Sequence, residues 1–315
     1  MASGIVAYSS PFVPAEWIAA HRLTPLRLTP GPSVVAAGAG ICPFAHDFLQ
    51  ASQVPGVADG VIFTTTCDQM RRFAEQARAS LPTFLMNVPA TWQTTEAVGL
   101  YVAELRRMSE FLITLGGHAP TAEELRQTME AFDKIRRNGS FESRAQWEKD
   151  RGGAAGDTLP MNLASSEKGF IRIALVGGPL RKQDAWIAEH LQHAGATIVL
   201  DATETGERTL PAPFDEARVR TDPLAELARA YFLTIPDAFR RPDSLLHDYL
   251  SREVQARRIR GILLIRCVWC DQWHAQVARI KDSLGVPVVE IDLGQDDHDT
   301  PRIKTRIDSL LDMVR

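Results

Sequence analysis

Short apolar runs alternate with amphipathic stretches along most of this chain. The apolar runs are rich in β-branched residues and end at Gly or Pro, which is typical of parallel strands buried on both faces. They cover Ser33–Ala37, Val61–Thr65, Thr83–Val88, Ile171–Val176, Thr197–Leu200, Gly261–Ile265 and Val286–Ile291. The stretches with apolar residues at helical spacing cover Leu100–Leu115, Thr121–Arg137, Ala185–His193 and Arg302–Met313. Strands that alternate with helices predict an α/β fold with a doubly wound parallel sheet.

This alternation is interrupted by a small, polar stretch from Arg151 to Lys168. A fresh strand-turn-helix pattern then starts at Ile171, and linkers of this composition mark domain boundaries. We therefore predict two domains that meet near residue 165. The N-terminal α/β domain, with a helical segment, covers residues 1–165, and the C-terminal α/β domain covers residues 166–315. A chain of 315 residues is long enough for both.

Composition and charge narrow the class of protein. Hydrophobic residues make up 45% of the chain and charged residues 23%, which is typical of a folded globular protein. The formal net charge of -4 gives no general attraction for nucleic acid. No run approaches the roughly 18 apolar residues that cross a bilayer, and the N-terminus lacks the pattern of a signal peptide. We expect a cytoplasmic protein that binds neither nucleic acid nor a membrane.

The four cysteines lie just after predicted strands, at Cys42, Cys67, Cys267 and Cys270. The carboxyl ends of parallel strands form the edge where open α/β sheets bind ligands, so these thiols could converge on one cleft. In a reducing compartment they are metal ligands, catalytic thiols or core residues rather than disulfides. The triplet Cys-Asp-Gln recurs at Cys67 and Cys270 in the same strand-to-helix setting, which favours two related halves.

The pair Cys267-Val-Trp-Cys270 has a spacing that suits zinc, an iron-sulfur cluster or a dithiol redox centre. A thioredoxin-like centre would lie near the start of a βαβ pattern, whereas this pair lies near the end of the chain. Structural zinc often takes two such pairs, and the isolated Cys42 and Cys67 do not form a second one. A noncatalytic zinc-binding or interaction subunit nevertheless stays an alternative.

Motifs along most of the chain resemble a known family. They include Pro14-Ala-Glu-Trp-Ile-Ala-Ala20, Cys42-Pro-Phe, Gly60-Val-Ile-Phe-Thr-Thr-Thr-Cys67-Asp-Gln, Cys270-Asp271 and Gly285-Val-Pro-Val-Val-Glu-Ile-Asp292. In this order they resemble an iron-sulfur subunit of the 2-hydroxyacyl-CoA dehydratase and benzoyl-CoA reductase family, which is related to double-cubane cluster proteins. The resemblance implies two Rossmann-like (flavodoxin-like) domains with a cluster in the cleft between them. It assigns the cluster ligands to Cys42, Cys67 and Cys270.

The resemblance also implies radical chemistry on CoA thioesters. A separate ATP-hydrolysing iron-sulfur activator supplies an electron, and the subunit passes it at low potential to an acyl-CoA or aryl-CoA substrate. The partner subunit is a paralogue or a second copy of the chain. No G-x-x-x-x-G-K-[ST] loop occurs here, in agreement with ATP hydrolysis elsewhere. The glycines of Val176-Gly-Gly-Pro179 predict a tight strand-to-helix turn rather than a phosphate cradle. A double-cubane reductase of small molecules is the alternative within this class.

Three thiolates leave one iron of a 4Fe-4S cluster without a protein ligand. Cys267 is additional to this set. It is a fourth ligand, a bridge of a double-cubane cluster or an ordinary buried thiol, and we favour the last two. His46, four residues beyond Cys42, is a weak candidate for a proton donor. We expect Asp68 and Asp271 to cap the helices that follow them.

Overall fold

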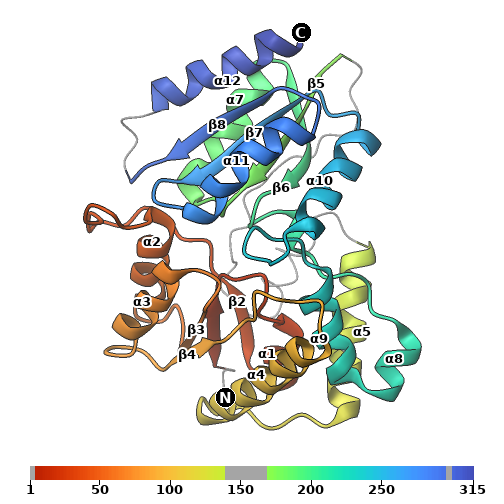
Figure 1. Ribbon diagram of the computed structural model, residues 1–315. Helices are drawn as coiled ribbons and strands as arrows, with labels where there is room; N and C mark the ends of the chain where they lie inside the picture. The colour runs from red at the N-terminus through yellow and green to blue at the C-terminus, as the bar shows by residue number, and fades with distance from the viewer. Residues whose placement is uncertain (1–3, 139–168, 296–299) are drawn as a thin grey trace. The chain divides into compact units, whose positions relative to one another are not determined.

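The computed structural model describes residues 4–138, 169–295 and 300–315 (Figure 1). These residues form two compact units, each with its own sheet. The first unit comprises residues 4–29, 48–138 and 210–235, and the second comprises residues 30–47, 169–209, 236–295 and 300–315. The predicted domain boundary near residue 165 lies outside the described residues.

The first unit is built on four parallel strands in the order β2-β1-β3-β4. The strands are β1 (Ile5–Tyr8), β2 (Thr24–Arg27), β3 (Gly60–Thr64) and β4 (Thr83–Met86). Every residue of β3 is buried, as expected for an inner strand covered on both faces. The helices are α1 (Ala15–Ala20), α3 (Asp68–Ala77), α4 (Thr95–Thr114), α5 (Ala122–Asn138), α8 (Glu216–Thr221) and α9 (Pro223–Thr234).

The predicted strand at Ser33–Ala37 is wrong. These residues form no strand, and Val34 and Val35 are exposed. Two adjacent valines indicated a strand, but the flanking Pro, Gly and Ala residues supply no further buried side chains. The strands that come first in the structure are β1 and β2, which the pattern missed. β2 is a short segment that contains Pro25, so its propensity for a strand is low.

The second unit repeats the same arrangement, with parallel strands in the order β6-β5-β7-β8. The strands are β5 (Ile171–Gly177), β6 (Ala196–Ala202), β7 (Gly261–Cys267) and β8 (Val288–Leu293). The helices are α7 (Trp186–His193), α10 (Ser244–Ala256), α11 (Asp271–Ser283) and α12 (Thr300–Val314), with short 3-10 turns at Lys182–Ala185 and Glu207–Thr209. Helix α2 (Pro43–Ser52) starts in the second unit and ends in the first.

Alternate residues of β5 face two separate cores. Ile173 and Leu175 pack with side chains of α7 and α12, whereas Ala174 and Val176 pack with side chains of α10 and α11. Successive side chains of a strand point to opposite faces, so helices cover both faces of this sheet. The predicted α/β class with doubly wound parallel sheets is confirmed.

The shared strand order places the first and third strands of each sheet side by side. In a doubly wound sheet this is the switch point, where successive crossovers leave in opposite directions and ligands bind at the carboxyl edge. In the first unit Cys67 follows β3, and in the second unit Cys267 is the last residue of β7 and Cys270 follows it. The repeated triplet Cys-Asp-Gln therefore occupies equivalent positions in two sheets of the same topology.

Candidate functional site

Cys67 and Cys270 each occupy the N-cap position of the helix that follows the third strand. Cys67 precedes α3 and Cys270 precedes α11, and both side chains are half-buried. Amide N–H groups at a helix N-terminus favour a thiolate there. The prediction that Asp68 and Asp271 cap these helices is wrong, because the cysteines hold the cap position. The two carboxylates lie in the first turn, where negative charge still suits the helix dipole.

Cys42 and Cys267 form a hydrogen-bonded pair of thiols within the second unit. Cys267 is the buried last residue of β7, and its Sγ lies 4.0 Å from the carbonyl oxygen of Pro179. Cys42 is half-buried and directly precedes Pro43, the first residue of α2. The sequence predicts that the four thiols could converge on one edge, but it does not predict this hydrogen bond, because Cys42 and Cys267 lie far apart along the chain.

The hydrogen bond has opposite effects on the two thiols. It lowers the pKa of Cys42 to about 7, and Arg181 and the amides of Phe44 and Ala45 act in the same direction. The same bond, together with burial, raises the pKa of Cys267 well above its ordinary value. Cys267 therefore keeps its proton and donates it toward the sulfur of Cys42. The lowered pKa favours the thiolate form of Cys42, which is the form that binds metals.

A buried arginine lies beside this pair. The side chain of Arg181 is only 4% exposed, and its Nε donates to Asp184 Oδ2 at 3.3 Å. Its Nη1 donates to Asp47 Oδ2 at 3.3 Å, and its Nη2 donates to the carbonyl oxygen of Gly294 at 2.7 Å. Burial of a guanidinium is tolerated only with such partners. Its positive charge favours the thiolate form of both Cys42 and Cys267.

His46, the weak candidate for a proton donor, is buried on α2. Its Nδ1 lies 3.3 Å from Asp47 Oδ1, and its backbone N–H donates to the carbonyl oxygen of Cys42 at 3.0 Å. The contact with Asp47 fixes the orientation of the imidazole. The role of His46 in proton transfer stays a prediction.

All four cysteines are free thiols, and soft thiolate donors suit an iron-sulfur cluster. Cys67 belongs to the first unit, and Cys42, Cys267 and Cys270 belong to the second. Among the described residues, no three His, Cys, Asp or Glu side chains lie close enough together to hold a metal ion. Thiolate donors suit an iron-sulfur cluster by their chemistry. The ligand set Cys42, Cys67 and Cys270 stays a prediction.

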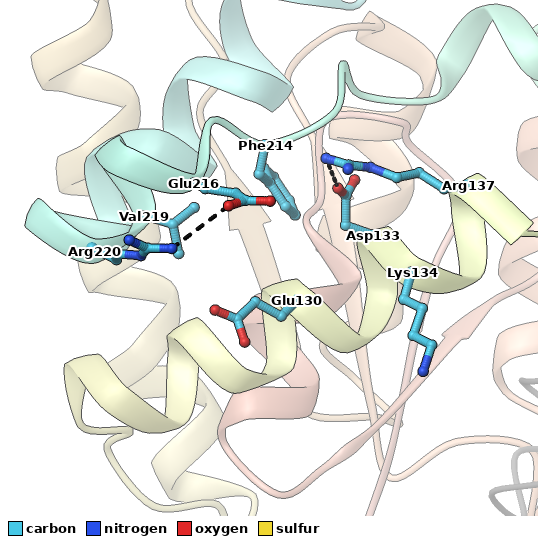
Figure 2. Close-up of a pocket in the computed structure, with 8 residues that line it drawn as sticks. All are labelled: Glu130, Asp133, Lys134, Arg137, Phe214, Glu216, Val219 and Arg220. Carbon is cyan, nitrogen blue, oxygen red and sulfur yellow. Dashed lines mark ion pairs between the residues drawn. The ribbon is translucent and has the colours of Figure 1, made fainter.

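A pocket of about 340 Å³ lies in the first unit, away from these residues in sequence. Figure 2 shows charged side chains of both signs around it, from α5 and from the segment that includes α8. Asp133 pairs with Arg137 at 2.7 Å, and Glu216 pairs with Arg220 at 3.6 Å. These ion pairs cancel much of the positive charge that the phosphates of CoA would need. None of the predicted site residues lines this pocket.

The family model for 2-hydroxyglutaryl-CoA dehydratase, D-component, matches residues 11–140 and 155–314. The chain belongs to this family. The match spans both units and all four cysteines, and it confirms the family predicted from the motifs. The D-component family is a dehydratase component, so the chain is an enzyme subunit. No curated protein matches the chain. Among the described residues of the chain, no helix is both long and apolar enough to span a bilayer.

Proposed function

We propose that this chain is the cluster-holding subunit of a radical-type 2-hydroxyacyl-CoA dehydratase. The observation that carries this proposal is the family match across nearly the whole chain. The electron comes from a separate ATP-hydrolysing iron-sulfur activator, and the substrate is an acyl-CoA. A paralogous subunit or a second copy of the chain completes the enzyme. The dehydratase is favoured over benzoyl-CoA reductase, because the matching family is defined by dehydration.

The cluster is held by Cys42, Cys67 and Cys270 in this proposal. All three residues are half-buried, whereas Cys267 is buried. Two of them occupy the N-cap positions of helices, and the pKa of the third, Cys42, is lowered to about 7, which favours its thiolate form. When bound, a 4Fe-4S cluster with three thiolates supplies an open iron for the substrate and an electron at low potential.

Cys267 has a different role from the other three cysteines. It is buried, and its pKa is raised, so it is disposed to stay a thiol. A thiol that donates to the sulfur of Cys42 stabilises negative charge there, which is how hydrogen bonds tune cluster ligands. His46 remains our candidate for moving a proton near Cys42, with Asp47 orienting its ring.

Anaerobic expression followed by reconstitution with iron and sulfide tests this proposal. We expect about four irons and four sulfides per chain, with the broad visible absorption of sulfur-to-iron charge transfer. With activator, ATP and partner subunit present, the loaded protein should dehydrate a 2-hydroxyacyl-CoA. Stoichiometric zinc without that absorption would support the zinc-binding alternative instead. Eight irons held jointly by two copies, with reduction of small molecules lacking CoA, would support the double-cubane alternative.

A further inference from the structure

Residues 30–47 belong to the second unit, although the chain on both sides of them belongs to the first. Both ends of this segment are tied to adjacent residues after β5. At one end, the backbone N–H of Lys182 donates to the carbonyl oxygen of Pro30 at 3.0 Å. At the other end, Arg181 Nη1 donates to Asp47 Oδ2 at 3.3 Å. Cys42 lies inside the segment that these two contacts close.

Arg181 is itself fixed by the second sheet. Asp184 accepts from both the backbone N–H and the side chain of Arg181, at 2.7 Å and 3.3 Å. The carbonyl oxygen of Gly294, just after β8, accepts from Nη2 at 2.7 Å. A planar guanidinium can serve three acceptors at fixed angles, which a lysine ammonium cannot reproduce. Arg181 thus connects α2 with the carboxyl edge of the sheet, the edge at which Cys267 lies.

We propose that Arg181 is a positioning residue for Cys42. Its guanidinium holds residues 30–47 in the second unit, so that the thiol of Cys42 stays against the thiol of Cys267. Asp47 is the contact on the segment, and Asp184 and Gly294 are the contacts on the sheet. The consequence for the cluster rests on the proposed function, since it needs Cys42 to be a ligand.

The test measures the proximity of two thiols in metal-free protein. The parent is the full chain with Cys67→Ser and Cys270→Ser, in which Cys42 and Cys267 are the only cysteines. Diamide oxidises neighbouring thiols to a disulfide, and mass spectrometry follows its formation. We expect Arg181→Lys to slow this pairing about tenfold, the effect of losing roughly one charge-assisted hydrogen bond.

Arg208→Lys is the matched control. Arg208 is a buried arginine of the same unit, paired with Asp237 at 3.0 Å, and its other acceptors are backbone carbonyl oxygens outside residues 30–47. This variant should pair its thiols at the parent rate. Asp47→Asn is a second test variant, because it weakens the contact on α2 while Arg181 keeps Asp184. Asp47→Asn should also slow the formation of the disulfide. This variant tests the positioning role if circular dichroism shows that Arg181→Lys does not fold.

Pairing at the parent rate in a folded Arg181→Lys or Asp47→Asn variant would overturn the positioning role. Equal slowing by Arg208→Lys would also overturn it, since the effect would then be general loosening. The iron content of the wild-type chain separates this proposal from the proposed function. Slow pairing in the variants together with an iron-free wild type would keep the role of Arg181 and remove the cluster.

Discussion

Two thiols of the second unit, Cys42 and Cys267, share a hydrogen bond that lowers the pKa of one and raises that of the other. The ligand set predicted from the resemblance includes Cys42 and Cys270, and Cys267 is additional to it. The contact gives Cys267 a physical role as a hydrogen-bond donor at the sulfur of Cys42. A residue outside the predicted ligand set can therefore tune the chemistry of a residue within it.

A buried carboxylate leads us to predict how the free energy of unfolding depends on pH. Asp201 lies on β6 and accepts from the backbone N–H and the hydroxyl of Thr203, at 3.0 Å and 2.7 Å. Burial raises its pKa from 3.8 to about 6. As the pH rises from about 4 to about 6, the unfolded chain therefore loses this proton before the folded chain does, and Asp201 destabilises the fold.

Asp201→Asn removes this titration and keeps the Oδ1 acceptor. Relative to the wild type, we expect the variant to gain roughly 2–3 kcal/mol of unfolding free energy between pH 4 and pH 7. Urea denaturation at a series of pH values measures this difference. The exposed Asp312→Asn variant, on α12, supplies the control. A difference that does not depend on pH would show that Asp201 ionises normally in the folded chain.

The sequence predicts some of these residues and misses others for identifiable reasons. Cys67 and Cys270 are found by their triplet, because a repeated motif after a strand is a local signal. Arg181 carries no such signal, since an arginine within Pro-Leu-Arg-Lys looks like part of a solvated loop. Its burial depends on Asp47, which is distant in sequence. Contacts of this kind arise from topology and not from local pattern.

At the scale of the elements, the backbone of β5 passes close to the backbone of β7 at Gly177. Gly177 has a φ of 144°, and a Cβ there would lie 1.7 Å from the carbonyl oxygen of Ile265 on β7. The carbonyl oxygen is part of the sheet backbone and cannot move aside cheaply. Gly177 is the last residue of β5 and Gly178 lies in the bend that follows it, so the strict need for glycine is at Gly177.

Gly177→Ala should therefore lower the free energy of unfolding by about 3 kcal/mol or more. Gly178→Ala is the control, because its nearest neighbour would be Trp273 Cδ1 at 3.4 Å, an ordinary contact. We expect the control to cost less than about 1 kcal/mol. Thermal and urea denaturation of both variants measure the difference. Equal stability of the two variants would mean that β5 and β7 are not packed as described.

Three helices of the first unit meet at a buried carboxylate. Glu16 of α1 is fully buried, accepts from the hydroxyl of Tyr231 on α9 at 2.6 Å and pairs with Arg136 of α5. The guanidinium of Arg136 also lies 4.8 Å above the ring of Phe214. Glu16 belongs to the Pro14–Ala20 motif, so this part of the family pattern has a structural role within the first unit.

Removal of one partner leaves the charge of Glu16 uncompensated. Arg136→Met should cost about 3–5 kcal/mol of stability, and Tyr231→Phe about 1–3 kcal/mol. The adjacent Arg137→Met variant should cost less than about 1 kcal/mol, because the Arg137 side chain is 51% exposed. Urea denaturation at neutral pH gives all three values. Similar costs for Arg136→Met and Arg137→Met would contradict a buried network.

At the scale of the whole molecule, two sheets of the same strand order each place a Cys-Asp-Gln triplet at the switch point. The α/β class was predictable because alternating strands and helices are a strong repeating signal. The first two strands and the contribution of residues 30–47 to the second unit were not. A strand of four residues is too short to show a clear hydrophobic pattern. The membership of residues 30–47 in the second unit depends on contacts with residues that are distant in sequence.

Metal loading should stabilise the chain as a whole. The proposed ligands Cys42, Cys67 and Cys270 are widely spaced along the sequence, and a cluster that binds only the folded chain shifts the equilibrium toward it. We expect the anaerobically reconstituted protein to melt several degrees above the iron-free protein, roughly 5 °C or more. Scanning calorimetry under argon measures this shift. Identical melting temperatures would indicate that iron does not bind through folded ligands.

The most direct test of the account is the iron content of four single variants, reconstituted anaerobically beside the wild type. Cys42→Ala, Cys67→Ala and Cys270→Ala should each lose most of the roughly four irons per chain, because each removes one of three ligands. Cys267→Ala should retain its iron, because Cys267 is not one of the three proposed ligands. Full iron content in Cys67→Ala, or iron loss in Cys267→Ala as severe as in the other three, would contradict the proposed cluster site.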